Sequence, residues 1–78
     1  MPKFSTAAIA AAKEIMAQTT NPAAVSASMK QSFDGQFGPV WHCVAGTNFG
    51  SQVIHESRTF IFFIMGGLSV LLFRSGTD

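Results

Sequence analysis

The chain has 78 residues, a formal net charge of +1 and 47% hydrophobic residues. A domain this small buries only a modest share of its surface, so we expect it to be supported by a partner chain. The five basic residues form no stripe, which argues against nucleic-acid binding, and a single cysteine excludes an intrachain disulfide and is typical of a reducing compartment such as the cytosol.

The first predicted element is an alanine-rich helix over residues 5–19. Ser5 and Thr6 are candidates for its N-cap, and the helix is expected to end near Thr19. Its apolar face is marked by residues at helical spacing: Ile9, Ala12 and Met16.

A second helix is predicted over residues 22–34. It begins at Asn21-Pro22, because asparagine is a good N-cap and proline is tolerated in the first helical position. The pairs Asp34-Gly35 and Gly38-Pro39 are expected to end it. Its apolar stripe consists of Val25, Met29 and Phe33.

The second half is rich in β-branched and aromatic residues bounded by glycine, which predicts strands. Gly66-Gly67 predicts a tight two-residue hairpin between the last two strands, and the segment 46–48 is expected to form the turn between the first two. The strands are placed at residues 40–45, 49–55, 59–65 and 68–73. The whole chain, residues 1–78, is therefore predicted to be one α+β domain with two N-terminal helices packed on an antiparallel sheet.

The last two predicted strands, Phe60–Met65 and Leu68–Phe73, are apolar on both faces. Two short helices can cover only one side of the sheet, so the other side needs a second layer. A second copy of the sheet is the simplest source, and a membrane surface or a larger partner is the alternative. The uncharged run 60–73 has 14 residues and is shorter than the about 17 to 25 that a membrane-spanning helix needs. We therefore expect no membrane span, with a short membrane anchor as a minor alternative.

The sequence Trp41-His42-Cys43 places a thiol beside an imidazole, a combination that can form a nucleophile and its base. Strand alternation should instead separate them, with Trp41, Cys43 and Ala45 on one face and Val40, His42 and Val44 on the other. We expect Cys43 to be a small buried hydrophobic residue and the protein to have no catalytic site. His42 is either a satisfied structural histidine or a pH-sensitive contact. One cysteine and two histidines fall short of a structural zinc pattern, so no metal or cofactor is expected.

The segment from Asn48 to His55 is the candidate binding site. Its small polar residues would bury poorly inside a sheet but suit an exposed edge, which could accept a peptide as an added strand. An ordinary edge strand protected by its polar residues is an equally good interpretation of the pattern. His55 and Glu56 are interpreted as a solvated strand end.

Several of these combinations together resemble the small hub class of dynein light chains, the eight-kilodalton type. The resemblance rests on Phe33-Asp34, Trp41-His42-Cys43-Val44, Asn48-Phe49-Gly50-Ser51, His55-Glu56, Phe60-Ile61 and Leu71-Leu72-Phe73-Arg74-Ser75-Gly76, a stretch of about forty residues. It implies a strand-exchanged dimer in which Phe49–Ile54 crosses to the neighbouring subunit and partner peptides add beside it. It also implies that His42 is an interface histidine linked to pH-dependent dissociation and that phosphorylation of Ser75 disfavours the dimer.

By the same resemblance, the peptide-binding groove comprises Asn48, Phe49, Gly50, Ser51, Gln52, Val53, Ile54, His55, Phe62 and Ile64. The dimer interface comprises His42, Val44, Phe49, Gly50, Ser51 and Ser75.

The chain departs from the family at several positions. Only residues 1–4 precede the first helix, where the family has a strand, and Pro22-Ala23 replaces a usual Glu-Lys pair. The family usually has tyrosine, threonine, tyrosine and tyrosine where this chain has Gln52, Ile54, Phe62 and Ile64, so its groove is expected to be more apolar and its partner range narrower.

The resulting prediction is a non-catalytic light chain, as a homodimer or as a heterodimer with a related light chain, that binds dynein intermediate-chain peptides. Its expected location is the cytoplasm and cytoskeleton, with an axonemal dynein of a cilium or flagellum as the specialised case. A general dimerisation hub for other partners is the alternative.

Overall fold

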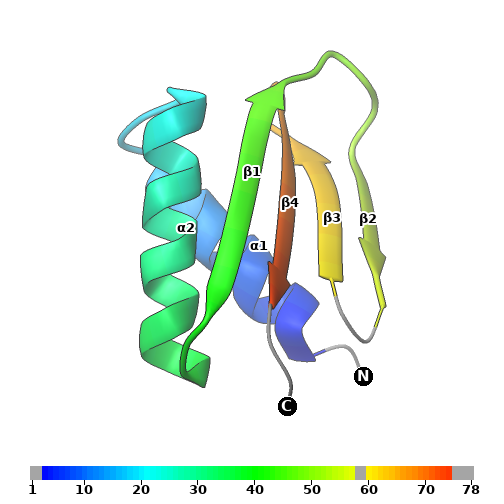
Figure 1. Ribbon diagram of the computed structural model, residues 1–78. Helices are drawn as coiled ribbons and strands as arrows, with labels where there is room; N and C mark the ends of the chain where they lie inside the picture. The colour runs from blue at the N-terminus through cyan, green and yellow to red at the C-terminus, as the bar shows by residue number, and fades with distance from the viewer. Residues whose placement is uncertain (1–2, 58–59, 75–78) are drawn as a thin grey trace.

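The structure, a computed structural model, describes residues 3–57 and 60–74, except for the side chain of Lys3. Two helices lie side by side on one face of a four-stranded antiparallel sheet (Figure 1). The elements are α1 (Lys3–Met16), α2 (Pro22–Phe37), β1 (Trp41–Thr47), β2 (Val53–Glu56), β3 (Phe60–Met65) and β4 (Leu68–Arg74). This arrangement confirms the predicted α+β class with its helices on one side of the sheet.

Helix α1 begins earlier and ends earlier than predicted. Ser5 lies inside the helix rather than at its cap, so the predicted N-cap is wrong. After Met16 the helix relaxes into a turn in which the Thr19 N–H still donates to the Ile15 carbonyl at 3.1 Å. Such a loosened last turn is a common helix end.

Helix α2 starts as predicted and ends later. The Asn21 side chain accepts from the Ala24 N–H at 3.1 Å, and Pro22 takes the first helical position. The helix then continues through Asp34-Gly35 to Phe37, and the Gly38 N–H donates to the Asp34 carbonyl at 3.0 Å. A glycine inside a helix costs about 1 kcal/mol; the added turn packs the Phe37 ring against Phe4, 4.9 Å between centroids, which offsets that cost.

The sheet has the strand order β1-β4-β3-β2, and every neighbouring pair is antiparallel. Gly66 and Gly67, with φ of 60° and 81°, join β3 to β4 after the pair Met65–Leu68. This confirms the two-residue hairpin, since its favoured turn needs positive φ at both central residues. The predicted turn at 46–48 is wrong, because Gly46 and Thr47 belong to β1 and pair with β4.

The strand predicted over residues 49–55 is shorter and shifted, since β2 begins at Val53. Strands β1 and β2 lie at opposite edges of the sheet, so residues 48–52 must pass over the ends of β4 and β3 (Figure 1). Within this loop, the Asn48 side-chain oxygen accepts from the Gly50 N–H at 2.7 Å. This side-chain-to-backbone bond satisfies one N–H group of the loop in place of sheet pairing.

The core lies between the helices and the sheet. Its largest fully buried side chains are Phe33, Phe63, Met29, Ile61, Leu68, Leu72, Val25 and Val70. Trp41 is buried with them, and Cys43 and Ala45 pack against the same cluster while Val44 on the other face is exposed. The predicted alternation along β1 is therefore confirmed.

The apolar run 60–73 forms β3, the tight turn and β4, and not a helix. Among the residues that the structure describes, no helix is long and apolar enough to cross a membrane.

Candidate functional site

The outer edge of β2 is the first feature of the candidate site, because β2 pairs only with β3 in the described chain. Just beyond this strand, the Ser57 N–H donates to the Phe60 carbonyl at 2.8 Å. Hydrogen-bonded pairs alternate along an antiparallel ladder, so the pairs His55–Phe62 and Val53–Ile64 are the bonded ones. The main-chain N–H and C=O groups of Ile54 and Glu56 therefore point outward, where an added strand could use them.

The end of β2 is attached to the first turn of α1. The backbone N–H of Ser5 donates to Glu56 Oε1 at 3.0 Å, and the Ser5 hydroxyl donates to the same oxygen. Ser5 is buried, and the first N–H groups of a helix have no partner within the helix. A carboxylate at this position satisfies one of them and interacts favourably with the helix dipole. Glu56 is thus a structural link, and its interpretation as a solvated strand end is wrong.

A groove lies between α1 and the outer edge of β2. One hollow of about 370 Å³ is lined by Ile9, Lys13, Gln52, Val53, Ile54, Ile64 and Met65. An adjoining hollow is lined by Ser5, Thr6, Ile9, Ala10, Lys13 and Ile54. The two hollows share Ile9, Lys13 and Ile54, so we treat them as one surface and call it the α1–β2 groove.

The sheet face opposite the helices is a second apolar surface, which we call the open face. Val44 and Val53 are 60% and 50% exposed there, at opposite edges of the sheet. Beside Val44 on β1, the His42 ring stacks on Phe73 of β4 with 5.3 Å between centroids. The remaining half-buried members of this face are Phe60, Phe62, Ile64 and Leu71. No helix of the described residues covers this side of the sheet (Figure 1).

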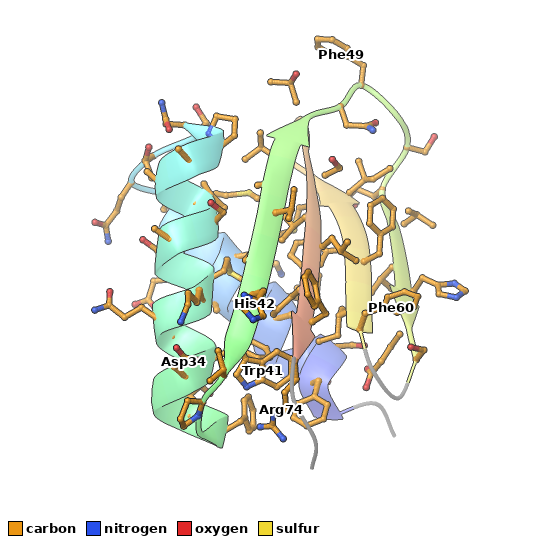
Figure 2. The ribbon with its side chains drawn as sticks, viewed as in Figure 1. Asp34, Trp41, His42, Phe49, Phe60 and Arg74 are labelled. Carbon is orange, nitrogen blue, oxygen red and sulfur yellow. The ribbon has the colours of Figure 1, made fainter. Side chains whose placement is uncertain are left out.

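The structure divides the predicted groove residues into three groups. Val53, His55, Phe62 and Ile64 come together on the open face, where Val53 pairs with Ile64 and His55 with Phe62. Ile54 points to the opposite face, toward α1. Residues 48–52 form the loop above the sheet, and Figure 2 shows Phe49, 99% exposed, projecting away from it.

The predicted dimer-interface residues are also separated. His42 and Val44 lie on β1, the edge of the sheet opposite β2, whereas 49–51 belong to the loop. Ser75 lies outside the described residues. The strand exchange implied by the resemblance is not present in the single chain, in which β2 pairs with β3 of the same molecule.

The Cys43 thiol lacks the low pKa and the neighbouring base that a catalytic nucleophile needs. Burial raises its pKa to about 12, so the thiol stays protonated near neutral pH. Its side chain points toward the helices and that of His42 toward the open face, so the imidazole is not placed to take its proton. Within residues 3–57 and 60–74, no three histidine, cysteine, aspartate or glutamate residues gather into a group that could hold a metal ion.

Sequence reasoning missed Lys13 and the pairing of Ser5 with Glu56. Lys13 follows Ile9 by four positions, which places the two on one helix face and was the available signal for a shared surface. Nothing local indicates that this face borders β2, because Ser5 and Glu56 are 51 positions apart.

Comparison with known proteins identifies relatives of the whole domain. The family model described as dynein light chain type 1 matches residues 1–75. The chain is also similar in structure to the dynein light chain-like domain of the Fasciola hepatica calcium binding protein FhCaBP2, with a TM-score of 0.71 and 24% identity over 97% of this chain and 83% of that one. A mercury derivative of the same domain gives a TM-score of 0.71 and 25% identity over 99% of this chain and 84% of that one.

Proposed function

This chain belongs to the dynein light chain family, and we propose that it is a non-catalytic, dimeric clamp for extended peptide segments of dynein intermediate chains. The family is generally non-catalytic, and its members generally dimerise and bind dynein intermediate chains. Family membership also suggests association with the cytoskeleton. For this chain itself, we propose the specific partner, the dimeric state and the cellular location.

The observation that carries the proposal is the outer edge of β2. Ile54 and Glu56 present outward main-chain groups, and an extended peptide that pairs with them would extend the sheet by one strand. Main-chain pairing supplies affinity for any extended segment, and side chains on either face then supply selectivity. This edge supports a binding function better than the half-buried Cys43, whose thiol stays protonated near neutral pH, supports a catalytic one.

The open face supports the dimer. It carries exposed and half-buried apolar side chains on every strand, with no covering layer in the described chain. Removing this surface from water would be favourable by about 25 cal/mol per Å² of apolar area. A second copy would supply a matching apolar layer by symmetry, and two copies would present two peptide sites.

We further propose that the predicted peptide-binding groove binds a narrow set of partners, and that this chain is a subunit of an axonemal dynein of a cilium or flagellum. Gln52, Ile54, Phe62 and Ile64 lack the hydroxyl groups that the family usually has at these positions. Phe62 lies on the open face, Gln52 and Ile54 line the α1–β2 groove, and Ile64 borders both surfaces, so this loss affects both surfaces beside the β2 edge. A site without those donors would favour apolar partner side chains over threonine.

Native mass spectrometry of the purified chain, mixed with an intermediate-chain peptide of the threonine-glutamine-threonine type, tests this function. Two chains with two peptides are the expected species for the clamp. A species of two chains without peptide would support the dimer but exclude the threonine-type peptide as its partner. Detection of single chains alone, without peptide, would refute the clamp.

A pair of variants makes the dimer test specific. Val44→Glu introduces a charge on the open face, so it should convert the dimer to single chains, because burying an unpaired carboxylate is strongly unfavourable. Ala27→Glu adds the same charge to an exposed position of α2 and should leave the dimer intact. Equal behaviour of the two variants would exclude the open face as the interface.

A further inference from the structure

The α1–β2 groove gives the β2 edge a side-chain preference that main-chain pairing alone would not. We propose that it selects extended segments in which an aliphatic residue and an acidic residue stand two positions apart. This inference rests on the proposed function, since it names the chemistry of the peptide that adds to the β2 edge.

Helix α1 and strand β2 run in opposite directions beside each other. The start of the helix lies at the end of the strand, where Ser5 binds Glu56. The later part of the helix lies at the start of the strand, where Lys13 lines a hollow with Gln52 and Val53. Each position along an added strand would therefore face a definite position along α1.

The aliphatic preference follows from Ile54. Its main-chain groups point outward, so one residue of an added strand would stand directly opposite it. Directly opposed residues share a face of the sheet, and Ile54 faces α1 in a hollow shared with Ile9. Ile54 is 45% exposed, and an aliphatic side chain placed between it and Ile9 would cover apolar surface on both.

The acidic preference follows from Lys13. The next side chain of the added strand on the same face lies two residues away, opposite Gln52, and there it would face Lys13. Among the residues that the structure describes, Lys13 is the one charged residue that lines either hollow. In the described part of the chain, the ion pair observed is that between Lys30 and Asp34. Lys13 is therefore not neutralised by a carboxylate of these residues. The neighbouring Glu14 lines a different hollow, between α1 and α2.

A displayed library of random ten-residue peptides, selected on the purified chain, tests the preference without knowledge of the partner. Selected peptides should carry an aliphatic residue and an aspartate or glutamate two positions apart, in either order, since the order depends on the direction of the added strand. Their affinity should fall as salt rises, because exposed charges are screened.

Two matched variants connect the selection to the groove. Lys13→Gln should weaken a selected peptide by about two- to five-fold, as expected for one exposed ion pair. Lys30→Gln is the same substitution on α2, which does not contact β2, and should leave binding unchanged. Selection on Lys13→Glu should replace the acidic residue by lysine or arginine.

The outcomes separate the two proposals. Acid-containing peptides whose affinity depends on Lys13 support the inference. Peptides that bind with no acidic preference, or equally well to wild type and Lys13→Gln, overturn it while leaving the clamp in place. A library that yields no binding peptide at all overturns the inference and the peptide-binding function together.

Discussion

The link between Glu56 and Ser5 leads to a quantitative prediction for Glu56→Ala. The substitution leaves the Ser5 N–H and hydroxyl without their acceptor at a buried position. A donor left unsatisfied costs about 1–3 kcal/mol, and water entering the space left by the side chain would recover part of it. We therefore expect the free energy of unfolding to fall by about 2–3 kcal/mol, out of the about 4–12 kcal/mol usual for a chain of this length.

Urea unfolding followed by tryptophan fluorescence measures this change. Trp41 is the only tryptophan of the chain and is 3% exposed, so unfolding alters its surroundings strongly. All variants should be compared at one protein concentration, since dimerisation makes stability concentration-dependent. Glu14→Ala is the matched control, an exposed glutamate of α1 whose loss should cost less than about 0.5 kcal/mol.

A double-mutant cycle with Ser5→Ala assigns the loss to this contact. Ser5→Ala removes the hydroxyl and keeps the backbone N–H, so it should cost less than Glu56→Ala. The two losses should not add in the double variant, because each removes part of one interaction. A Glu56→Ala effect within 0.5 kcal/mol of that of Glu14→Ala would show that the link contributes little and that the reasoning is wrong.

Three further predictions concern single residues. The side-chain hydrogen bond from Lys30, together with the hydrogen bond from the Trp41 N–H at 2.8 Å, lowers the pKa of Asp34. The stability that the Asp34 carboxylate contributes is therefore complete above the ordinary carboxyl pKa and is lost as the pH falls through the pKa of Asp34 in the folded protein. Between pH 6 and pH 3, the urea midpoint of the wild type should fall more than that of Asp34→Asn. With its pKa raised to about 12, Cys43 has roughly one thiolate in ten thousand at pH 8, so the folded chain should react with a disulfide reagent much more slowly than the chain in urea, on the order of a thousandfold; equal rates would contradict the shielding of this thiol from water. Gly35→Ala, with open space around it in α2, should raise the unfolding free energy by about 0.5–1 kcal/mol, whereas Gly67→Ala, at a φ of 81°, should lower it by about 1 kcal/mol or more, and calorimetry should show melting temperatures displaced in opposite directions.

The candidate site was predictable from sequence only in part. Small polar residues led to the prediction of an edge strand over residues 49–55, and β2 is an edge strand, but Gly50, Ser51 and Gln52, on which the prediction rested, lie in the loop before it. The start of β2 depends on the strand order, which requires residues 48–52 to cross the sheet end instead of pairing. Strand order is a global property of the sheet, and no local pattern in this segment specifies it.

What the sequence by itself determined are the features that adjacent residues control. Asn21-Pro22 sets the start of α2 through a capping hydrogen bond between two residues three positions apart, Asn21 and Ala24. Gly66-Gly67 sets the hairpin because glycine takes positive φ at little cost. The position of Trp41 in the core is also set locally, because successive side chains of a strand such as β1 point to opposite faces of the sheet. Only the tertiary structure decided that Glu56 binds Ser5 and that Lys13 borders the β2 edge, because both depend on how α1 lies against a strand some forty to fifty residues further along the chain.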